Sequence, residues 1–255
     1  MSPLKVHVAV IGARQHYAVA RLLQQAGMLG RLYTDLYVDE KSWATRLMTL
    51  PLSVVGPDAK RRLIGNSAGD YLPPEKIVAF NLFGLKYRWG VSRAGSSSTL
   101  NRLYIQGAAA FAKRVARHGL DGAQALYSYN GPSAELFRHA KKQGILCILE
   151  QILIPQGKVR RLMQGEMERW PGWEPALRFD SSQGALEERE EEEWRLADLI
   201  IGSSPFVLEG LREWGVPAEK CSLIPSGVPL EMFPLKEGAG LPADRCGSSL
   251  PATSV

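Results

Sequence analysis

Several features are scarce or missing in this 255-residue sequence, and each absence excludes a class of protein. No run of about 18 uncharged apolar residues occurs, which excludes a transmembrane helix. The three cysteines, Cys147, Cys221 and Cys246, are widely spaced, so they form neither a disulfide framework nor a zinc pattern. We expect Cys147 and Cys221 to be buried in apolar stretches, and the chain to occupy a reducing, cytoplasmic setting.

Nucleotide-binding and hydrolytic motifs are also missing. The turn after the first predicted strand keeps only Gly12 of the Gly-x-Gly-x-x-Gly pattern, which disfavours a nicotinamide or flavin dinucleotide. The sequence contains no phosphate-loop motif, no His-x-x-x-His pair and no Ser/His/Asp order. A nucleotide-dependent oxidoreductase therefore stays a disfavoured alternative.

What the sequence does contain is an alternation of strand and helix signals. Short apolar runs predict strands over 6–11, 31–38, 125–129, 145–149, 198–203 and 221–224. Apolar stripes between them predict helices over 17–26, 132–144, 183–196 and 205–214, with one or two more ending near 170. This order predicts an α/β fold with a Rossmann-like parallel sheet flanked by helices.

Residues 41–118 are expected to form a mostly helical insertion. Within it, residues 41–95 carry nine basic side chains against three acidic ones, together with Trp43 and Trp89. Such a region is typical of a peripheral contact with an anionic membrane surface. A solvated surface of mixed charge is the alternative, and the sequence leaves both open.

The acidic run from Glu187 to Glu193 could indicate metal binding or a solvated helix surface. Consecutive acids point around a helix instead of converging on one ion, so we expect the solvated surface.

Polar residues follow the predicted strands at their carboxyl ends. Arg14 and His16 follow the first strand, Asn130 follows the strand over 125–129, and Glu150 and Gln151 follow the strand over 145–149. Ligands of open parallel sheets bind at this edge, and these groups would suit hydrogen bonding to a polyol. A purely local role for His16 is the alternative.

The final strand and helix signals resemble a known family. The segment ending in ADLIIGSS at residue 204, a short helix, Gly215-Val216 and LIPSGVPLEMFP over 223–234 follow one another. This order resembles the end of the N-terminal domain of retaining, family 4 glycosyltransferases of the GT-B type. Pro229 stands where those chains usually have an aspartate. The resemblance implies that 1–234 form a GT-B N-terminal, Rossmann-like domain, and that 235–255 are a linker or disordered tail.

The resemblance implies a hexosyltransferase-type glycosyltransferase that moves a sugar from a nucleotide-sugar to an acceptor hydroxyl with retention. The chain would be its acceptor-binding half, inactive alone, because the C-terminal donor-binding domain is missing. A shifted reading frame or truncation near Arg245 and a natural short form are the alternatives for this gap. The donor is a substrate, and neither a cofactor nor a metal is expected. A sugar or lipid-linked acceptor is the expected second partner, and no nucleic acid is.

By position, the resemblance assigns three groups of residues. The donor-phosphate side of the cleft would contain Gly12, Ala13 and Arg14, and the hinge would contain Gly227, Val228 and Phe233. The acceptor side would contain His16, Asn130, Glu150 and Gln151, although many family members carry a histidine where Glu150 and Gln151 stand. A non-catalytic single-domain remnant or a partner-binding subunit is the alternative function.

Overall fold

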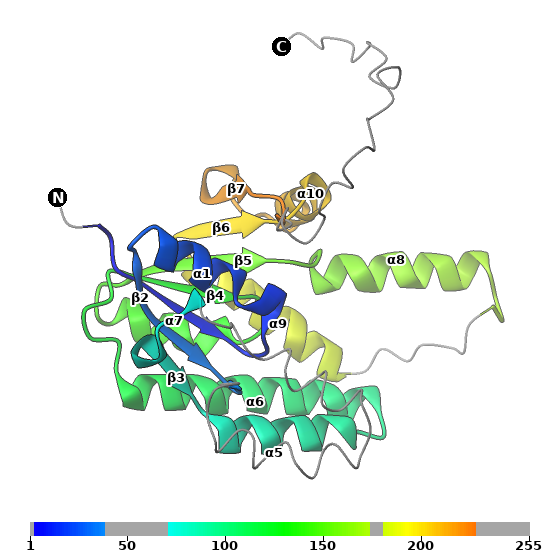
Figure 1. Ribbon diagram of the computed structural model, residues 1–255. Helices are drawn as coiled ribbons and strands as arrows, with labels where there is room; N and C mark the ends of the chain where they lie inside the picture. Colours follow the sequence, from blue (N-terminus) through cyan, green and yellow to red (C-terminus); the bar gives the residue numbers. More distant parts are fainter. Residues whose placement is uncertain (1–2, 39–70, 174–180, 228–255) are drawn as a thin grey trace, which may run out of the picture. The chain divides into compact units, whose positions relative to one another are not determined.

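A parallel β-sheet forms the centre of the chain in this computed structural model, which describes residues 3–38, 71–173 and 181–227 (Figure 1). Within these ranges the sheet has seven strands in the order β3-β2-β1-β4-β5-β6-β7, and every neighbouring pair is parallel. The strands are β1 (Val6–Val10), β2 (Leu29–Thr34), β3 (Ile77–Ala79), β4 (Ala125–Tyr129), β5 (Leu146–Gln151), β6 (Leu199–Gly202) and β7 (Cys221–Leu223). The predicted α/β, Rossmann-like class is confirmed.

Helices cover both faces of this sheet (Figure 1). α1 (Ala18–Gln25) packs on one face, and α6 (Ser97–His118), α7 (Ser133–Lys141), α9 (Ser181–Leu196) and α10 (Pro205–Glu213) pack on the other. α5 (Asn81–Ser92) lies beside α6, and α8 (Gln156–Arg169) precedes α9. Right-handed crossovers place α1 and α7 on opposite faces, because the strand order runs in opposite directions from β1 and from β4.

The two faces of the sheet bury separate hydrophobic cores. On the face of α6 and α7, Phe111 and Phe137 are fully buried against alternate residues of β4 and β5. On the face of α1, Val8 and Leu32 pack beneath Ala20. Each large apolar side chain buried in this way contributes about 1.5–3 kcal/mol relative to exposure. Contacts group Met1–Pro225 into one compact unit.

The strand boundaries differ from the prediction at the β2 side of the sheet. β2 ends at Thr34 instead of residue 38, because the carboxylate of the next residue, Asp35, turns inward to accept hydrogen bonds. β3 lies inside the region expected to be mostly helical, and it pairs with β2 from Leu32 to Thr34. Residues 41–70 of that region, and the predicted tail over 235–255, lie outside the described residues.

Candidate functional site

The turn after β1 has an unusual backbone. Gly12 has a φ of +85°, and Gln15, His16 and Tyr17 follow with φ values of 47°, 51° and 59°. Left-handed conformations cost non-glycine residues roughly 1–2 kcal/mol each, so surrounding contacts must hold this turn. The buried Tyr17 hydroxyl donates to the Leu36 carbonyl at 2.8 Å, which fixes the end of the turn.

Asp35 holds the beginning of the same turn. Its carboxylate is fully buried at the end of β2 and accepts a hydrogen bond from the Gly12 N–H at 2.7 Å. The Nε of Arg88, on α5, lies 3.2 Å from the other carboxylate oxygen and balances its charge. One partly buried ion pair therefore connects the β1–α1 turn to α5.

The carboxyl end of β4 lies next to that turn. The Arg14 guanidinium is exposed and lies 5.4 Å from the centroid of the Tyr129 ring, a cation–π contact. Gly131, with a φ of +105°, turns the chain after Asn130. The Ser133 hydroxyl then donates to the Tyr129 carbonyl at 2.5 Å, which closes the turn onto the first residue of α7.

Glu193 of α9 supplies the N-terminal cap that α7 lacks. Its side chain is fully buried and accepts from the backbone N–H groups of Gly131 at 2.7 Å, Ser133 at 2.7 Å and Ala134 at 3.2 Å. Pro132, the N-cap residue of α7, makes no side-chain capping hydrogen bond. Burial raises the pKa of Glu193 to about 7, although these N–H donors oppose the shift.

Glu190, one turn earlier on α9, accepts a hydrogen bond at the N-terminus of α8. One of its carboxylate oxygens accepts from the Gln156 N–H at 2.7 Å, and the other accepts from Gln151 Nε2 at 2.7 Å. Burial raises the pKa of Glu190 to about 7 as well. The expectation of a solvated surface for the acidic run is therefore wrong for Glu190 and Glu193. Their burial is stabilised by N–H donors from distant loops, which residue spacing alone does not reveal.

Glu150 belongs to the opposite face of the sheet. Side chains alternate along β5, so Glu150 lies on the face of α1, and Gln151 lies on the face of α9. The Tyr127 hydroxyl donates to Glu150 Oε2 at 2.5 Å. Burial raises the pKa of Glu150, and the nearby positive charge of Arg14 works against that shift.

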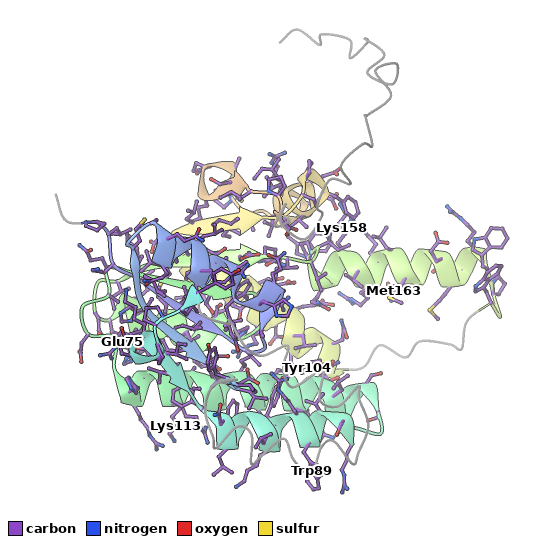
Figure 2. All side chains as sticks on the ribbon, in the orientation of Figure 1. Glu75, Trp89, Tyr104, Lys113, Lys158 and Met163 are labelled. Carbon is purple, nitrogen blue, oxygen red and sulfur yellow. The ribbon has the colours of Figure 1, made fainter. Side chains whose placement is uncertain are left out.

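A cavity of about 410 Å³ opens where the carboxyl ends of β1 and β4 meet. This is the topological switch point of the sheet, the position where open α/β sheets bind ligands. Tyr104 lies on its wall between α6 and α9 (Figure 2). Further lining comes from Ile11, Arg14, Tyr87, Ile105, Tyr129, Asn130, Leu186, Arg189, Glu190 and Glu193.

The predicted site residues are only partly brought together. Arg14 and Asn130 line the cavity, and Gly12 and Ala13 belong to the adjacent turn. His16 is exposed on that turn and lies outside the lining. Gln151 is fully buried, with its amide bonded to Glu190, Trp194 and the Leu153 carbonyl.

The remaining predicted positions lie elsewhere. Glu150 is not among the residues that line the cavity, and Gly227 is exposed near the end of the described chain. Val228 and Phe233 lie outside the described residues. In the described ranges, no three His, Cys, Asp or Glu side chains are grouped as a metal ion would need.

The residues missed from the sequence are the ones that shape the cavity. Tyr87 and Tyr104 come from α5 and α6, and Glu190 and Glu193 come from the acidic run. A signal existed for the last pair, since they occupy positions i and i+3 of a helix and therefore share one face.

Comparison with known proteins gives a fold-level likeness only. No protein-family model matches the chain, and no curated protein matches it. Among solved structures, a UDP-glucosyltransferase from Polygonum tinctorium matches at 14% identity with a TM-score of 0.42, covering 89% of this chain and 53% of that one. UGT2 from Phytolacca americana, solved with UDP-2-fluoro-glucose and pterostilbene, matches at 13% identity with a TM-score of 0.43. The match covers 89% of this chain and 54% of that one.

A UDP-N-acetylglucosamine 2-epimerase from Rickettsia bellii matches at 12% identity with a TM-score of 0.38, covering 87% of this chain and 44% of that one. The chain spans about half the length of the solved structures it matches. The fold class itself follows from the strand order and the parallel register.

Proposed function

We propose that the chain is the acceptor-side half of a GT-B glycosyltransferase of the family 4 type, which moves a sugar from a nucleotide-sugar to an acceptor hydroxyl with retention. The observation that carries the proposal is the cavity at the switch point, beside the held β1–α1 turn and lined by Arg14 and Asn130. The sequence resemblance supplies the reaction, and the cavity supplies a place for its acceptor.

The chemistry of the lining suits this role. Arg14 is exposed and, among the described residues, has no ion pair, so its charge is available to a departing diphosphate. The Tyr87, Tyr104 and Tyr129 side chains offer apolar faces to a sugar ring or other cyclic acceptor. Transfer of this kind depends on positioning, and the donor-binding contacts would come from a second domain.

The acceptor in this proposal is a sugar or a lipid-linked molecule that the chain meets at a membrane surface. Leu82, Leu85 and Trp89 are exposed on α5 at positions that share one face, and Figure 2 shows Trp89 pointing away from the sheet. Lys86 and Arg93 are exposed beside them. No helix in the described ranges is long and apolar enough to cross a membrane.

Thermal unfolding of the full chain with candidate donors tests the proposal. A ligand at about 100 times its Kd stabilises a protein by about 2.7 kcal/mol, so even weak binding is measurable at high concentration. We expect at least one nucleotide-sugar to raise the Tm, and Arg14→Gln to reduce that shift. Arg21→Gln is the matched control, because Arg21 also stacks on a tyrosine, Tyr71, away from the cavity lining. A shift with a nicotinamide dinucleotide, and none with nucleotide-sugars, would overturn the proposal.

A second candidate function, a non-catalytic partner-binding subunit, is favoured by one observation. Leu153, Phe206, Leu223 and Ile224 are exposed at or just beyond the carboxyl ends of β5, β6 and β7. Light scattering of the full chain tests this candidate. An assembly larger than one chain that is dispersed by Phe206→Ser with Ile224→Ser, in a protein that binds no donor, would support it.

A further inference from the structure

The loop after β4 and the first residue of α8 both line the cavity, and one helix, α9, holds both. The first loop, Asn130–Pro132, joins β4 to α7, and the second leads from β5 to Gln156 at the start of α8. Glu193 accepts from the Gly131 N–H of the first loop and from the Ser133 and Ala134 N–H groups at the start of α7. Glu190 accepts from the Gln156 N–H, where the second loop meets α8. Both carboxylates also line the cavity themselves.

The holding contacts extend beyond the two carboxylates. Arg189, also on α9, donates from Nε to the Gly131 carbonyl at 2.6 Å and pairs with Glu135 of α7. Gln151 donates to Glu190 and accepts from Trp194 Nε1 at 2.9 Å, which ties the end of β5 to α9. The polar groups of one face of α9 are therefore engaged with the loops that border the cavity.

We infer that Glu190 and Glu193 are positioning residues of the cavity: together they hold the loops after β4 and β5 in the arrangement that shapes its walls. This inference rests on the proposed function only for the identity of the cavity's occupant. The two side chains act through the loops that they bind, whatever ligand the cavity takes.

Protonation changes what each carboxylate can hold. An ionised carboxylate accepts every N–H that points at it, whereas a protonated one carries a hydroxyl that cannot accept along its own O–H direction. For Glu193, all three hydrogen-bond partners are N–H donors, so a proton on Glu193 removes an acceptor from a loop that lines the cavity. The raised pKa values place this change near neutral pH.

Most of the charged groups near the pair are themselves in ion pairs; Glu191, and Arg14 in the cavity lining, are in none among the described residues. Arg189 lies 3.9 Å from Glu193 and binds Glu135. The remaining neighbours are Arg138 of α7, paired with Glu192; Arg160 of α8, paired with Glu187; and Glu191 beside Glu190. The groups of α6 and β5 that face the cavity or contact Glu190 are uncharged. They are Asn101 and Tyr104 in the lining and Gln151, which donates to Glu190.

Nuclear magnetic resonance on the full chain, labelled at backbone amides and isoleucine δ1 methyls, tests the inference without any nucleotide-sugar. Ile11, just after β1, and Ile105, on α6, both line the cavity, so their methyls report on it, and the Ile77 methyl in β3 is a reference outside the lining. The variants are Glu193→Gln and Glu190→Gln. Glu192→Gln is the matched control, since Glu192 is a neighbour on α9 that pairs with Arg138 near the surface.

We expect Glu193→Gln to change the chemical shifts of the Gly131, Ser133 and Ala134 amides and of the Ile11 and Ile105 methyls. The chemical shift of the Ile77 methyl should stay unchanged. In the wild type, the same amides and cavity methyls should follow one titration near pH 7 that Glu193→Gln abolishes and Glu192→Gln preserves. If the chemical shifts of the amides change while those of the cavity methyls do not, the carboxylates only stabilise their helices and the inference is wrong.

The wild-type titration keeps the test decisive even if Glu193→Gln does not fold. If the chemical shifts of the cavity methyls stay constant over the pH range in which the Gly131 amide titrates, that result alone would overturn the inference. Failure here leaves the donor-binding test unaffected, because no donor is present. Conversely, a chain that binds no nucleotide-sugar can still show the coupled titration.

Discussion

At the scale of single residues, a tight constraint lies between His7 and Gly30. The His7 ring is buried between β1 and β2, and burial lowers its pKa to about 4, so it is neutral at physiological pH. A Cβ atom added to Gly30 would lie 2.3 Å from a carbon of that ring. Glycine at position 30 is therefore required by the histidine across the sheet.

Gly30→Ala is expected to lower the free energy of unfolding by about 1–3 kcal/mol, the usual cost of overpacking a core. Urea denaturation measures it. Gly165→Ala, at an exposed position of α8 with open space around it, is the control and should raise stability by about 0.5–1 kcal/mol. A loss below about 0.5 kcal/mol for Gly30→Ala would mean that the His7 ring can leave its place.

The left-handed turn after β1 gives a second prediction at this scale. His16→Gly should raise stability by up to about 1 kcal/mol, because glycine adopts a φ of 51° without steric cost. Thermal unfolding measures the change. Glu209→Gly, at an exposed position inside α10, should instead cost about 0.5–1 kcal/mol. Equal losses in both variants would show that the turn is not strained at residue 16.

At the scale of elements, α9 combines two opposing effects of pH. The folded-state pKa values of Glu190 and Glu193, about 7, exceed the ordinary value of 4.5. The stability that each proton gives is therefore complete below about pH 4.5 and is lost as the pH rises to about 7. Ionisation strengthens the hold on the loops, but it leaves a charge in the interior.

Replacing either residue by glutamine should remove its share of this pH dependence, at most about 1.4 kcal/mol per pH unit for each proton. Denaturation of the wild type and the variants from pH 4.5 to 8 measures the difference. Arg138 lowers the pKa of Glu192, so Glu192→Gln should remove a pH dependence of the opposite sign: the stability that Glu192 contributes is present above about pH 4.5 and is lost as the pH falls below it. Parallel pH curves for the wild type and Glu193→Gln would show that Glu193 ionises with an ordinary pKa.

The exposed face of α5 gives the membrane prediction. Trp89→Ser should weaken binding to vesicles of phosphatidylglycerol and phosphatidylcholine roughly tenfold, about 1.4 kcal/mol, by removing an apolar side chain that is 61% exposed. Trp173→Ser, which removes a 77% exposed tryptophan outside α5, should leave binding unchanged. Co-sedimentation at low and high salt measures both, and equal effects of the two substitutions would exclude α5 as the contact.

At the scale of the whole molecule, the sheet could be predicted because its strands are apolar runs separated by amphipathic helices. β3 could not, since Ile77–Ala79 is only three residues long and half-buried, and its pairing with β2 is decided by tertiary contacts.

The site residues could be predicted only where they directly follow a predicted strand. Arg14 and Asn130 follow strands directly, and parallel strands bring their carboxyl ends together. The spacing of Glu190 and Glu193 places them on one helix face, but the burial of Glu193 was not predictable, because it depends on N–H donors about 60 residues away. Gln151 was assigned to the cleft from its strand end, but the alternation of β5 turns its side chain into the core.

The most direct measurement of the central claim is a backbone-amide titration of the full chain with the nucleotide-sugar that raises its Tm most. We predict that the largest shifts fall on the turn from Gly12 to Tyr17 and on Asn130 and Gly131, and that Arg14→Gln reduces them. Shifts that avoid both segments and fall elsewhere in the chain would contradict a nucleotide-sugar-dependent site at this switch point.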